Sequence, residues 1–96
     1  MTSHQIYLPL FVLGRTVATP AARERLSELN YSPLDLLRLH MSGDWAEMDA
    51  DDQQANRDAI THGDRIFSAY IVEKTKFWVI TEADRSVTTI LLPSEY

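Results

Sequence analysis

The spacing of hydrophobic residues changes along the chain and predicts helices first and strands later. Apolar side chains recur every three or four positions between Ala22 and Met41, which is typical of amphipathic helices. After Gly63 the pattern shifts to a period of two, which is typical of half-buried strands. A further apolar run, residues 6–13, is short and rich in β-forming residues. We therefore expect an α+β fold in the order β-α-α-α-β-β-β.

Capping residues define the first two expected helices. Thr19-Pro20 and Ser32-Pro33 each place a hydroxyl at the N-cap and a proline at the first helical position. Asp35 stands where the acid of a capping box would lie. Asn30 and Gly43 are expected to end the two helices, and the short connection between the helices predicts an αα-hairpin.

A third helix is expected to begin near Asp49 and to stop at Gly63. It contains few apolar residues, so a large part of its surface should face water. Such a helix depends mainly on its caps and on the propensities of its residues.

Three short-linked strands, at residues 66–72, 77–81 and 87–92, predict an antiparallel meander. The run 6–13 is expected to be an edge strand that ends at Gly14 and completes a four-stranded sheet, because Pro9 cannot donate to an inner strand. Both alternating sets of residues in 66–72 are partly apolar, which predicts either a sheet covered on both faces or a partner on the second face. The expected core is Leu8, Leu10, Val12, Leu26, Leu29, Leu34, Leu37, Met41, Phe67, Ile71, Val79, Ile90 and Leu92.

Composition excludes several classes of protein. The 96 residues are enough for one domain, which we place at residues 1–96. Without cysteine the chain has no disulfide framework, thiolate zinc site or cysteine nucleophile. No apolar run is long enough to span a membrane, and the first residues lack the basic region of a secretion signal. We expect a cytoplasmic protein.

The negative charge is concentrated in one segment. Residues 44–58 contain six acids and a single base, Arg57, so this segment carries the whole net charge of −5. Phosphate binding needs clustered Lys and Arg, so we expect no direct binding of nucleic acid. A basic protein surface would be attracted to the segment, although acids also favour a helix start through the backbone dipole.

Eight residues are candidates for binding a partner. Six lie in or beside the acidic segment and two are aromatic residues of the sheet: Asp44, Trp45, Glu47, Asp49, Asp51, Asp52, Tyr70 and Trp78. Trp45 is either an interface anchor or a residue that locks its loop over the core. The acids lack the central Gly of a calcium loop, and capping explains them better, so we expect no metal and no cofactor.

A catalytic alternative rests on the polar loop 81–86. Glu82 would be a general base and Arg85 would stabilise an anion, with Tyr70 or Tyr96 assisting and His40 or His62 as an acid. The competing interpretation is a hairpin turn closed by a local charge pair and the Ser86 hydroxyl. For His40 on the leucine-rich helix, a hydrogen-bonded structural histidine is favoured over a metal ligand.

Short motifs run through residues 42–96. They are Ser42-Gly43-Asp44-Trp45, then Asp52, Asn56, Gly63, Arg65 and Ser68-Ala69-Tyr70, and finally the stretches 78–86 and 88–96. Together they resemble plasmid-related proteins, a family of short bacterial proteins from plasmids and mobile elements, some of which carry a label linking them to type I restriction systems. The resemblance implies a bacterial cytosolic setting on mobile DNA and supplies no active site.

These observations favour a small non-enzymatic interaction module of a mobile element. Its expected partner is a protein with a basic surface, or a second copy of itself, and an inhibitor of a host defence or restriction system is the concrete form. One alternative is a small hydrolase or toxin-like nuclease that uses Glu82 and Arg85. Another is a self-associating structural protein with paired sheets or edges.

Overall fold

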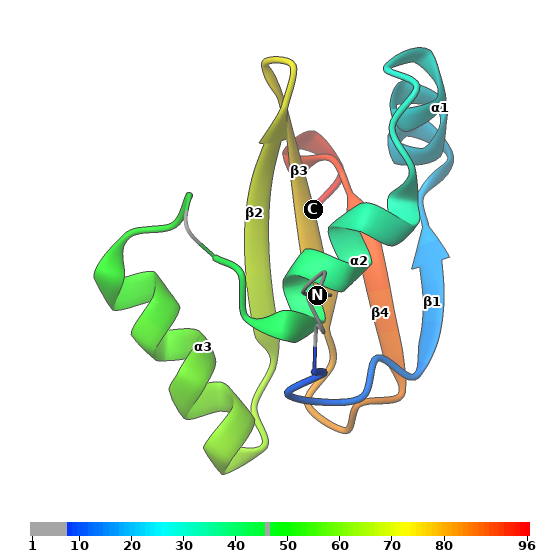
Figure 1. The fold of residues 1–96 in the computed structure, drawn as a ribbon. Helices are drawn as coiled ribbons and strands as arrows, with labels where there is room; N and C mark the ends of the chain where they lie inside the picture. Colours follow the sequence, from blue (N-terminus) through cyan, green and yellow to red (C-terminus); the bar gives the residue numbers. More distant parts are fainter. Residues whose placement is uncertain (1–7, 46) are drawn as a thin grey trace, which may run out of the picture.

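A four-stranded mixed sheet and three helices make up the protein in the computed structural model, which describes residues 8–45 and 47–96 (Figure 1). The α+β class and the three helices predicted from the sequence are confirmed. The elements in chain order are β1 (Arg15–Ala18), α1 (Pro20–Glu28), α2 (Pro33–Ser42), α3 (Ala50–His62), β2 (Ile66–Val72), β3 (Thr75–Thr81), β4 (Val87–Leu91) and the short 3₁₀ helix η1 (Pro93–Glu95).

The predicted caps hold the ends of the helices. Thr19 Oγ1 accepts the backbone N–H of Ala22 at 3.3 Å and starts α1. Asp49 does the same for α3, accepting from the N–H of Asp52 at 2.8 Å. Gly63 ends α3 with a positive φ, as a glycine at this position readily does. Local sequence therefore determines where these helices begin and end.

Two predicted details of the helices are wrong. Asp35 makes no capping box and instead lies 3.5 Å from Arg38. Helices α1 and α2 do not lie side by side as a hairpin, because α1 sits beyond the end of β1 while α2 crosses the sheet (Figure 1). The turn at Leu29–Asn30 changes the direction of the chain shortly before Pro33 starts α2.

The sheet has the strand order β1-β4-β3-β2 and is mixed. Strands β2, β3 and β4 are antiparallel neighbours, as their short turns predict. Strand β1 pairs with β4 in parallel, so the predicted antiparallel meander describes β2, β3 and β4 but not the whole sheet. No tight turn joins β1 to β4, so nothing local imposes an antiparallel pairing on these two strands.

The predicted edge strand at residues 6–13 is wrong over the residues that the structure describes; residues 6 and 7 lie outside them. Residues 8–13 contain no strand, and the edge strand is β1, which begins after Gly14. The Leu10 N–H bonds to the Met41 carbonyl at the end of α2 at 2.8 Å instead of joining a sheet. Gly14 has φ +65 and lies so close to the Arg85 carbonyl that a Cβ would come within 2.3 Å of that oxygen. The glycine therefore allows the close contact that starts β1 and does not end a strand.

The buried face of the sheet, called the inner face here, carries the set of β2 residues that begins at Ile66. Tyr70 and Val72 belong to the same set, and Phe77, Val79 and Ile90 continue it across β3 and β4. Leu26 and Leu36 pack against this face. Five members of the predicted core are exposed instead, namely Leu8, Leu10, Val12, Leu34 and Ile71.

The opposite face, called the outer face, is partly covered by the chain itself. Phe67 of β2 and Trp78 of β3 contact each other edge to face, with ring centroids 4.8 Å apart. Tyr96, which follows η1, contacts Trp78 in the same way at 5.5 Å. This packing accounts for the apolar residues on both faces of β2.

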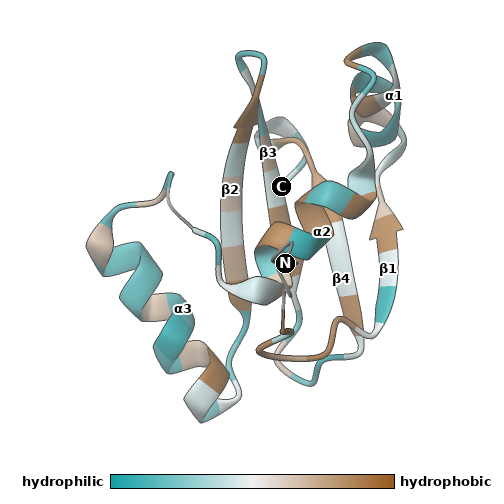
Figure 2. Cartoon of the chain, in the orientation of Figure 1, coloured by the Kyte–Doolittle hydropathy of each residue, from teal (hydrophilic) through white to brown (hydrophobic). Residues whose placement is uncertain are grey.

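Helix α3 lies beside the edge strand β2 and is largely hydrophilic (Figures 1 and 2). One buried side chain attaches it to the sheet. Asn56 Nδ2 donates to the Phe67 carbonyl at 2.7 Å, and Asn56 Oδ1 accepts the Phe67 N–H at 3.0 Å. The amide thus occupies the position that a further strand would take.

Asn56→Ala should lower the free energy of unfolding by about 1–3 kcal/mol, because it leaves two backbone groups of Phe67 without partners. Chemical denaturation with matched m-values measures the change. Gln54→Ala on the exposed side of the same helix is the control and should change stability by less than about 0.5 kcal/mol. Equal effects of the two variants would contradict this role of Asn56.

Candidate functional site

A chain of polar side chains crosses the inner face beneath α2. His40 Nδ1 lies 2.6 Å from Ser68 Oγ of β2, and His40 Nε2 lies 2.8 Å from Thr81 Oγ1 of β3. Thr81 Oγ1 is 2.7 Å from Thr88 Oγ1 of β4, which donates to the Leu13 carbonyl at 2.7 Å. His40, Ser68, Thr81 and Thr88 are all 0% exposed and are called the buried polar network below.

The direction of every proton in this network follows from its last member. The Leu13 carbonyl can only accept, so Thr88 donates to it and must accept from Thr81. Thr81 has then used its proton and accepts from His40 Nε2–H. His40 Nδ1 is left as an acceptor for the Ser68 hydroxyl. The geometry therefore selects the neutral imidazole with its proton on Nε2.

Burial reinforces the neutral state of this histidine. Desolvation lowers the pKa of His40 from 6.5 to about 3. The ring of Phe11 covers the imidazole edge to face, with centroids 5.2 Å apart. Because the ring and its partners are enclosed, they have no route to a substrate, and the network acts as a hydrogen-bonded part of the core.

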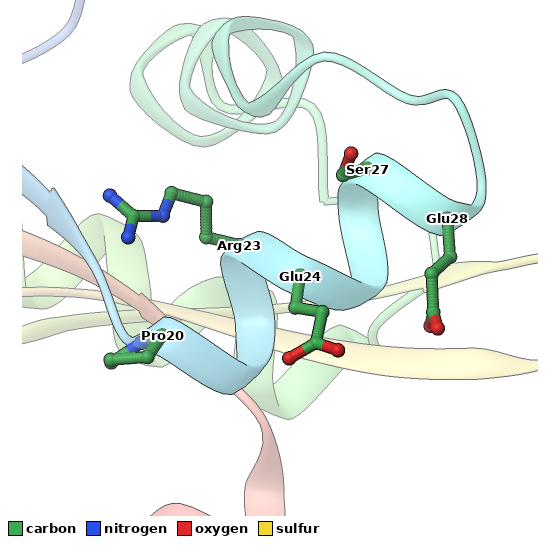
Figure 3. Close-up of a pocket in the computed structure, with 5 residues that line it drawn as sticks. All are labelled: Pro20, Arg23, Glu24, Ser27 and Glu28. Atoms are coloured by element: carbon green, nitrogen blue, oxygen red, sulfur yellow. The ribbon is translucent and has the colours of Figure 1, made fainter.

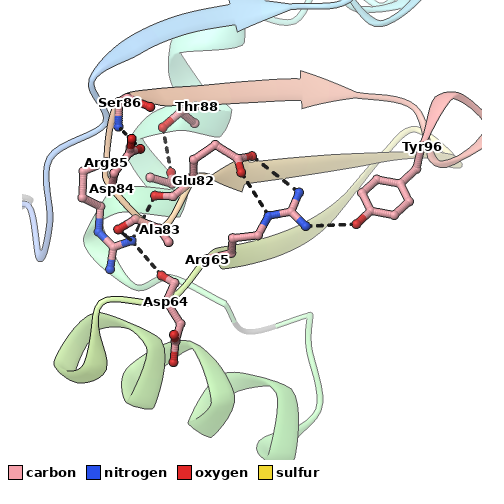
Figure 4. A network of polar contacts seen from close by, with 10 residues as sticks. Asp64, Arg65, Glu82, Ala83, Asp84, Arg85, Ser86, Thr88 and Tyr96 are labelled. Carbon is pink, nitrogen blue, oxygen red and sulfur yellow. Dashed lines mark hydrogen bonds and ion pairs between the residues drawn. The ribbon is translucent and has the colours of Figure 1, made fainter.

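Glu82 lies on the outer side of the sheet, next to Arg65 and Tyr96 (Figure 4). Its carboxylate is 3.3 Å from Arg65 Nε, and Arg65 also donates to the Tyr96 hydroxyl at 3.1 Å. The guanidinium lies 5.9 Å from the centre of the Tyr96 ring. Glu82 is thus engaged in an exposed ion pair that fastens the C-terminal residues to β2 and β3.

Arg85 is a structural clamp (Figure 4). It adopts φ +61 at the β3–β4 turn, and its Nη1 donates to the carbonyls of Asp64, Glu82 and Ala83 at 2.7–3.1 Å. Its Nη2 donates to the Ala59 carbonyl in the last turn of α3 at 3.1 Å. These contacts occupy the guanidinium with backbone oxygens and leave it no role as an anion binder.

The structure does not bring the proposed catalytic residues together. Glu82 and Tyr96 lie on the outer side, whereas His40 and Tyr70 lie on the inner face, so the sheet separates the two pairs. The hairpin-turn interpretation of the loop fits better, but the predicted local charge pair is wrong, because the Arg85 guanidinium donates to backbone carbonyls instead. Asp84 Oδ1 accepts the N–H of Ser86 at 3.0 Å, which closes the turn locally.

Two of the residues expected to bind a partner are buried, and that expectation is corrected. Trp45 is 2% exposed and locks its loop over the core, and Tyr70 is 4% exposed. The Tyr70 hydroxyl donates to the Asp44 carbonyl at 2.9 Å, and burial raises the pKa of this hydroxyl. Both aromatic residues hold the α2–α3 connection in place. Trp78 is half-buried on the outer face beneath Tyr96.

The other expected partner residues form an exposed acidic surface at the β2 edge, defined here as Asp44, Glu47, Asp49, Asp51 and Asp52. Two of them also make hydrogen bonds that stabilise the local structure. Glu47 accepts the Ile71 N–H of β2 at 2.8 Å, and Asp49 caps α3. A groove of about 320 Å³ runs between this surface and β2, with Ala69, Ile71 and Lys76 on its other side.

A second groove was not predicted from the sequence. It lies between β1 and α2, has a volume of about 210 Å³ and is lined by Thr16, Val17, Ala18, Pro33, Leu34, Leu37 and Ile90. The signal that marks it is Leu34, which the sequence predicts to lie in the core but which is 65% exposed. A third hollow is lined by residues of α1 alone, and there the Arg23 side chain points away from those of Glu24 and Glu28 (Figure 3).

Within residues 8–45 and 47–96 no group of three or more His, Asp or Glu is placed to hold a metal ion. No helix in the same residues is long and apolar enough to cross a membrane. Comparisons with protein-family models, curated proteins and solved structures give no match to this chain. The resemblance to plasmid-related proteins therefore stays a prediction.

We predict that His40 is the neutral Nε2–H tautomer at pH 7. Nitrogen-15 NMR of labelled protein should show a protonated Nε2 and an unprotonated Nδ1 for this residue. A protonated Nδ1 would reverse the direction of the network and contradict the assignment. Thr88→Val, which removes the hydroxyl that donates to Leu13, should weaken this tautomer preference and serves as the test of its cause.

Stability should fall as the pH drops below 6.5, because the folded protein resists protonation of His40 while the unfolded chain accepts the proton. Between pH 7.5 and pH 5 this effect of His40 should lower the free energy of unfolding by about 2 kcal/mol. The glutamine of His40→Gln does not titrate, so this variant should lose this part of the pH dependence. Its stability at pH 7.5 should be lower than that of the wild type. His62→Gln, which alters the exposed histidine of α3, should keep it.

Proposed function

We propose that this chain is a non-catalytic protein-binding module that binds the basic surface of a partner through its acidic surface. The proposal rests on the absence of basic partners for these carboxylates. Among the described residues the ion pairs are Arg25–Glu28, Arg38–Asp35 and Arg65–Glu82, and none of them includes a carboxylate of the acidic surface. Their charge is left to act on other molecules.

The position of the charge supports the same function. Glu47 and Asp49 are fixed by hydrogen bonds to the backbone, and Asp51 and Asp52 follow in the first turn of α3. Glu47 and Asp49, which are held in this way beside the β2 edge, present a defined pattern of negative charge to a partner. They would raise the association rate with a basic protein and repel nucleic acid phosphates.

A finer form of the proposal makes the chain an inhibitor of a host defence or restriction system. Its support is the resemblance to plasmid-related proteins, together with the acidic surface. An acidic module of this kind would cover the basic surface with which such an enzyme holds DNA. The alternative of a hydrolase or toxin-like nuclease has less support, because Arg85 is engaged with carbonyls and Glu82 with Arg65.

The test is a pull-down of host proteins in which three exposed carboxylates are neutralised by Asp44→Asn, Asp51→Asn and Asp52→Asn. The wild type should retain partners at about 50 mM salt and release them at about 300 mM, since screening weakens contacts between exposed charges. The triple variant should retain far less at low salt.

The matched control neutralises three exposed carboxylates elsewhere, by Glu24→Gln, Asp64→Asn and Glu73→Gln. It changes the net charge equally, so it should bind as the wild type does if position matters. Equal binding by both triple variants, or binding that does not respond to salt, would refute the proposal. Growth on induced expression tests the nuclease alternative, because toxicity abolished by Glu82→Gln would favour it.

A further inference from the structure

In the part of the protein that the structure describes, the rest of the chain covers one edge of the sheet, at β2, and leaves the other edge, at β1, open. At the β2 edge, Asn56 pairs with the backbone of Phe67, and Glu47 accepts the N–H of Ile71. Natural sheets commonly cover their edges in this way to prevent pairing with other chains. The β1 edge has no such cover among the described residues, and Figure 1 shows no element alongside it.

The open edge presents a defined set of hydrogen-bonding groups. The N–H groups of Arg15 and Thr19 bond to the carbonyls of Ser86 and Ile90 at 2.9 and 3.0 Å, so these residues face β4. Backbone groups alternate in direction along a strand, so the N–H and C=O groups of Thr16 and Ala18 point away from the sheet. Two donors and two acceptors are therefore free for another strand.

An apolar groove runs along this edge on the inner side of β1. Leu34, which is 65% exposed, stands at its rim, and Pro33 and Leu37 form its α2 side. Open strand edges beside an apolar groove are the setting in which proteins add an extended segment, with main-chain hydrogen bonds supplying affinity.

We infer that the occupant is the β1 strand of a second copy, paired antiparallel about a twofold axis at Val17. In this register Thr16 lies opposite Ala18 of the second copy, so the groups that point outward meet in four N–H···O=C bonds. The same surface serves both copies, as a twofold interface requires. The result is a continuous eight-stranded sheet.

Charge complementarity supports a second copy as the occupant. The register places Arg15 opposite Thr19 of the second copy, on the same side of the sheet. The Thr19 hydroxyl donates to Glu95 Oε1 at 2.6 Å, so a carboxylate stands beside it. Each Arg15 therefore faces Glu95 of the other copy, and this contact occurs twice. On the inner side the two Leu34 side chains approach each other over the central strands.

Sedimentation of the purified protein at about 5 μM and about 200 μM tests the inference, because dimer formation depends on concentration. A dimer should predominate at the higher concentration. Leu34→Lys should raise the dissociation constant at least tenfold, whereas Ile71→Lys should leave it within about twofold. Ile71 is a matched control, because it is also an exposed apolar residue (55%) and lies on the opposite edge strand.

A charge exchange and a hydrogen-exchange measurement identify the register. Arg15→Glu and Glu95→Arg should each weaken self-association, and an equal mixture of the two variants should restore it as a heterodimer. The amides of Thr16 and Ala18 should become more protected from exchange as the concentration rises. A monomer at about 200 μM, or a dimer in which Leu34→Lys has no effect and these amides stay unprotected, would overturn the inference.

These assays contain one purified protein and no basic partner, so they are independent of the acidic surface. The variants Asp44→Asn, Asp51→Asn and Asp52→Asn should dimerise as the wild type does. Loss of partner binding with an intact dimer, or the reverse, therefore shows which of the two surfaces has been assigned wrongly.

Discussion

The fold depends on the insertion of His40 between α2 and the sheet. Three neighbouring strands turn hydroxyl groups toward the core, at Ser68, Thr81 and Thr88, and buried hydroxyls without partners destabilise a protein. The imidazole is one group that both donates and accepts, so it satisfies Ser68 and Thr81 together. The network then ends on the Leu13 carbonyl and so ties the segment before β1 to the sheet. A leucine at position 40 would fill the space and leave the hydroxyls without this partner.

This arrangement also explains why the buried His40 does not have the properties of a catalytic base. A general base needs access to substrate and a pKa near the working pH. His40 has neither, because it is enclosed beneath Phe11 and its pKa is lowered to about 3. Its contribution is specificity of packing: the network has one proton arrangement, which fixes how α2 lies across β2, β3 and β4. The candidate catalytic side chains of the 81–86 loop likewise have structural roles, since Arg85 donates to the carbonyls at the end of α3.

Local signals in the sequence were sufficient for the helices and for the three later strands. The caps at Thr19, Ser32 and Asp49 depend on neighbouring residues only, and so do the short turns that make β2, β3 and β4 antiparallel. The parallel pairing of β1 with β4 depends on residues some seventy positions apart, and no local pattern reveals it. The apolar run before Gly14 has the composition of a strand, and composition does not show that the N–H of Leu10 bonds to Met41. The acidic surface could be predicted from the clustering of acids in the sequence. The groove beside β1 could not, because it becomes evident only when the structure shows that Leu34 is exposed.

The acidic surface and the open strand β1 lie at opposite edges of one sheet, and this placement relates the two proposals. The strand order β1-β4-β3-β2 puts β1 at one edge and the acidic surface beside β2 at the other. Pairing through β1 would therefore leave both acidic surfaces free, at the two far ends of the joined sheet. A dimer with two such surfaces binds an extended or repeated basic partner more tightly than one copy does, because the second contact becomes intramolecular. The covered β2 edge fits this arrangement, since Asn56 and Glu47 prevent further strands from adding there, and the pairing stops at two copies.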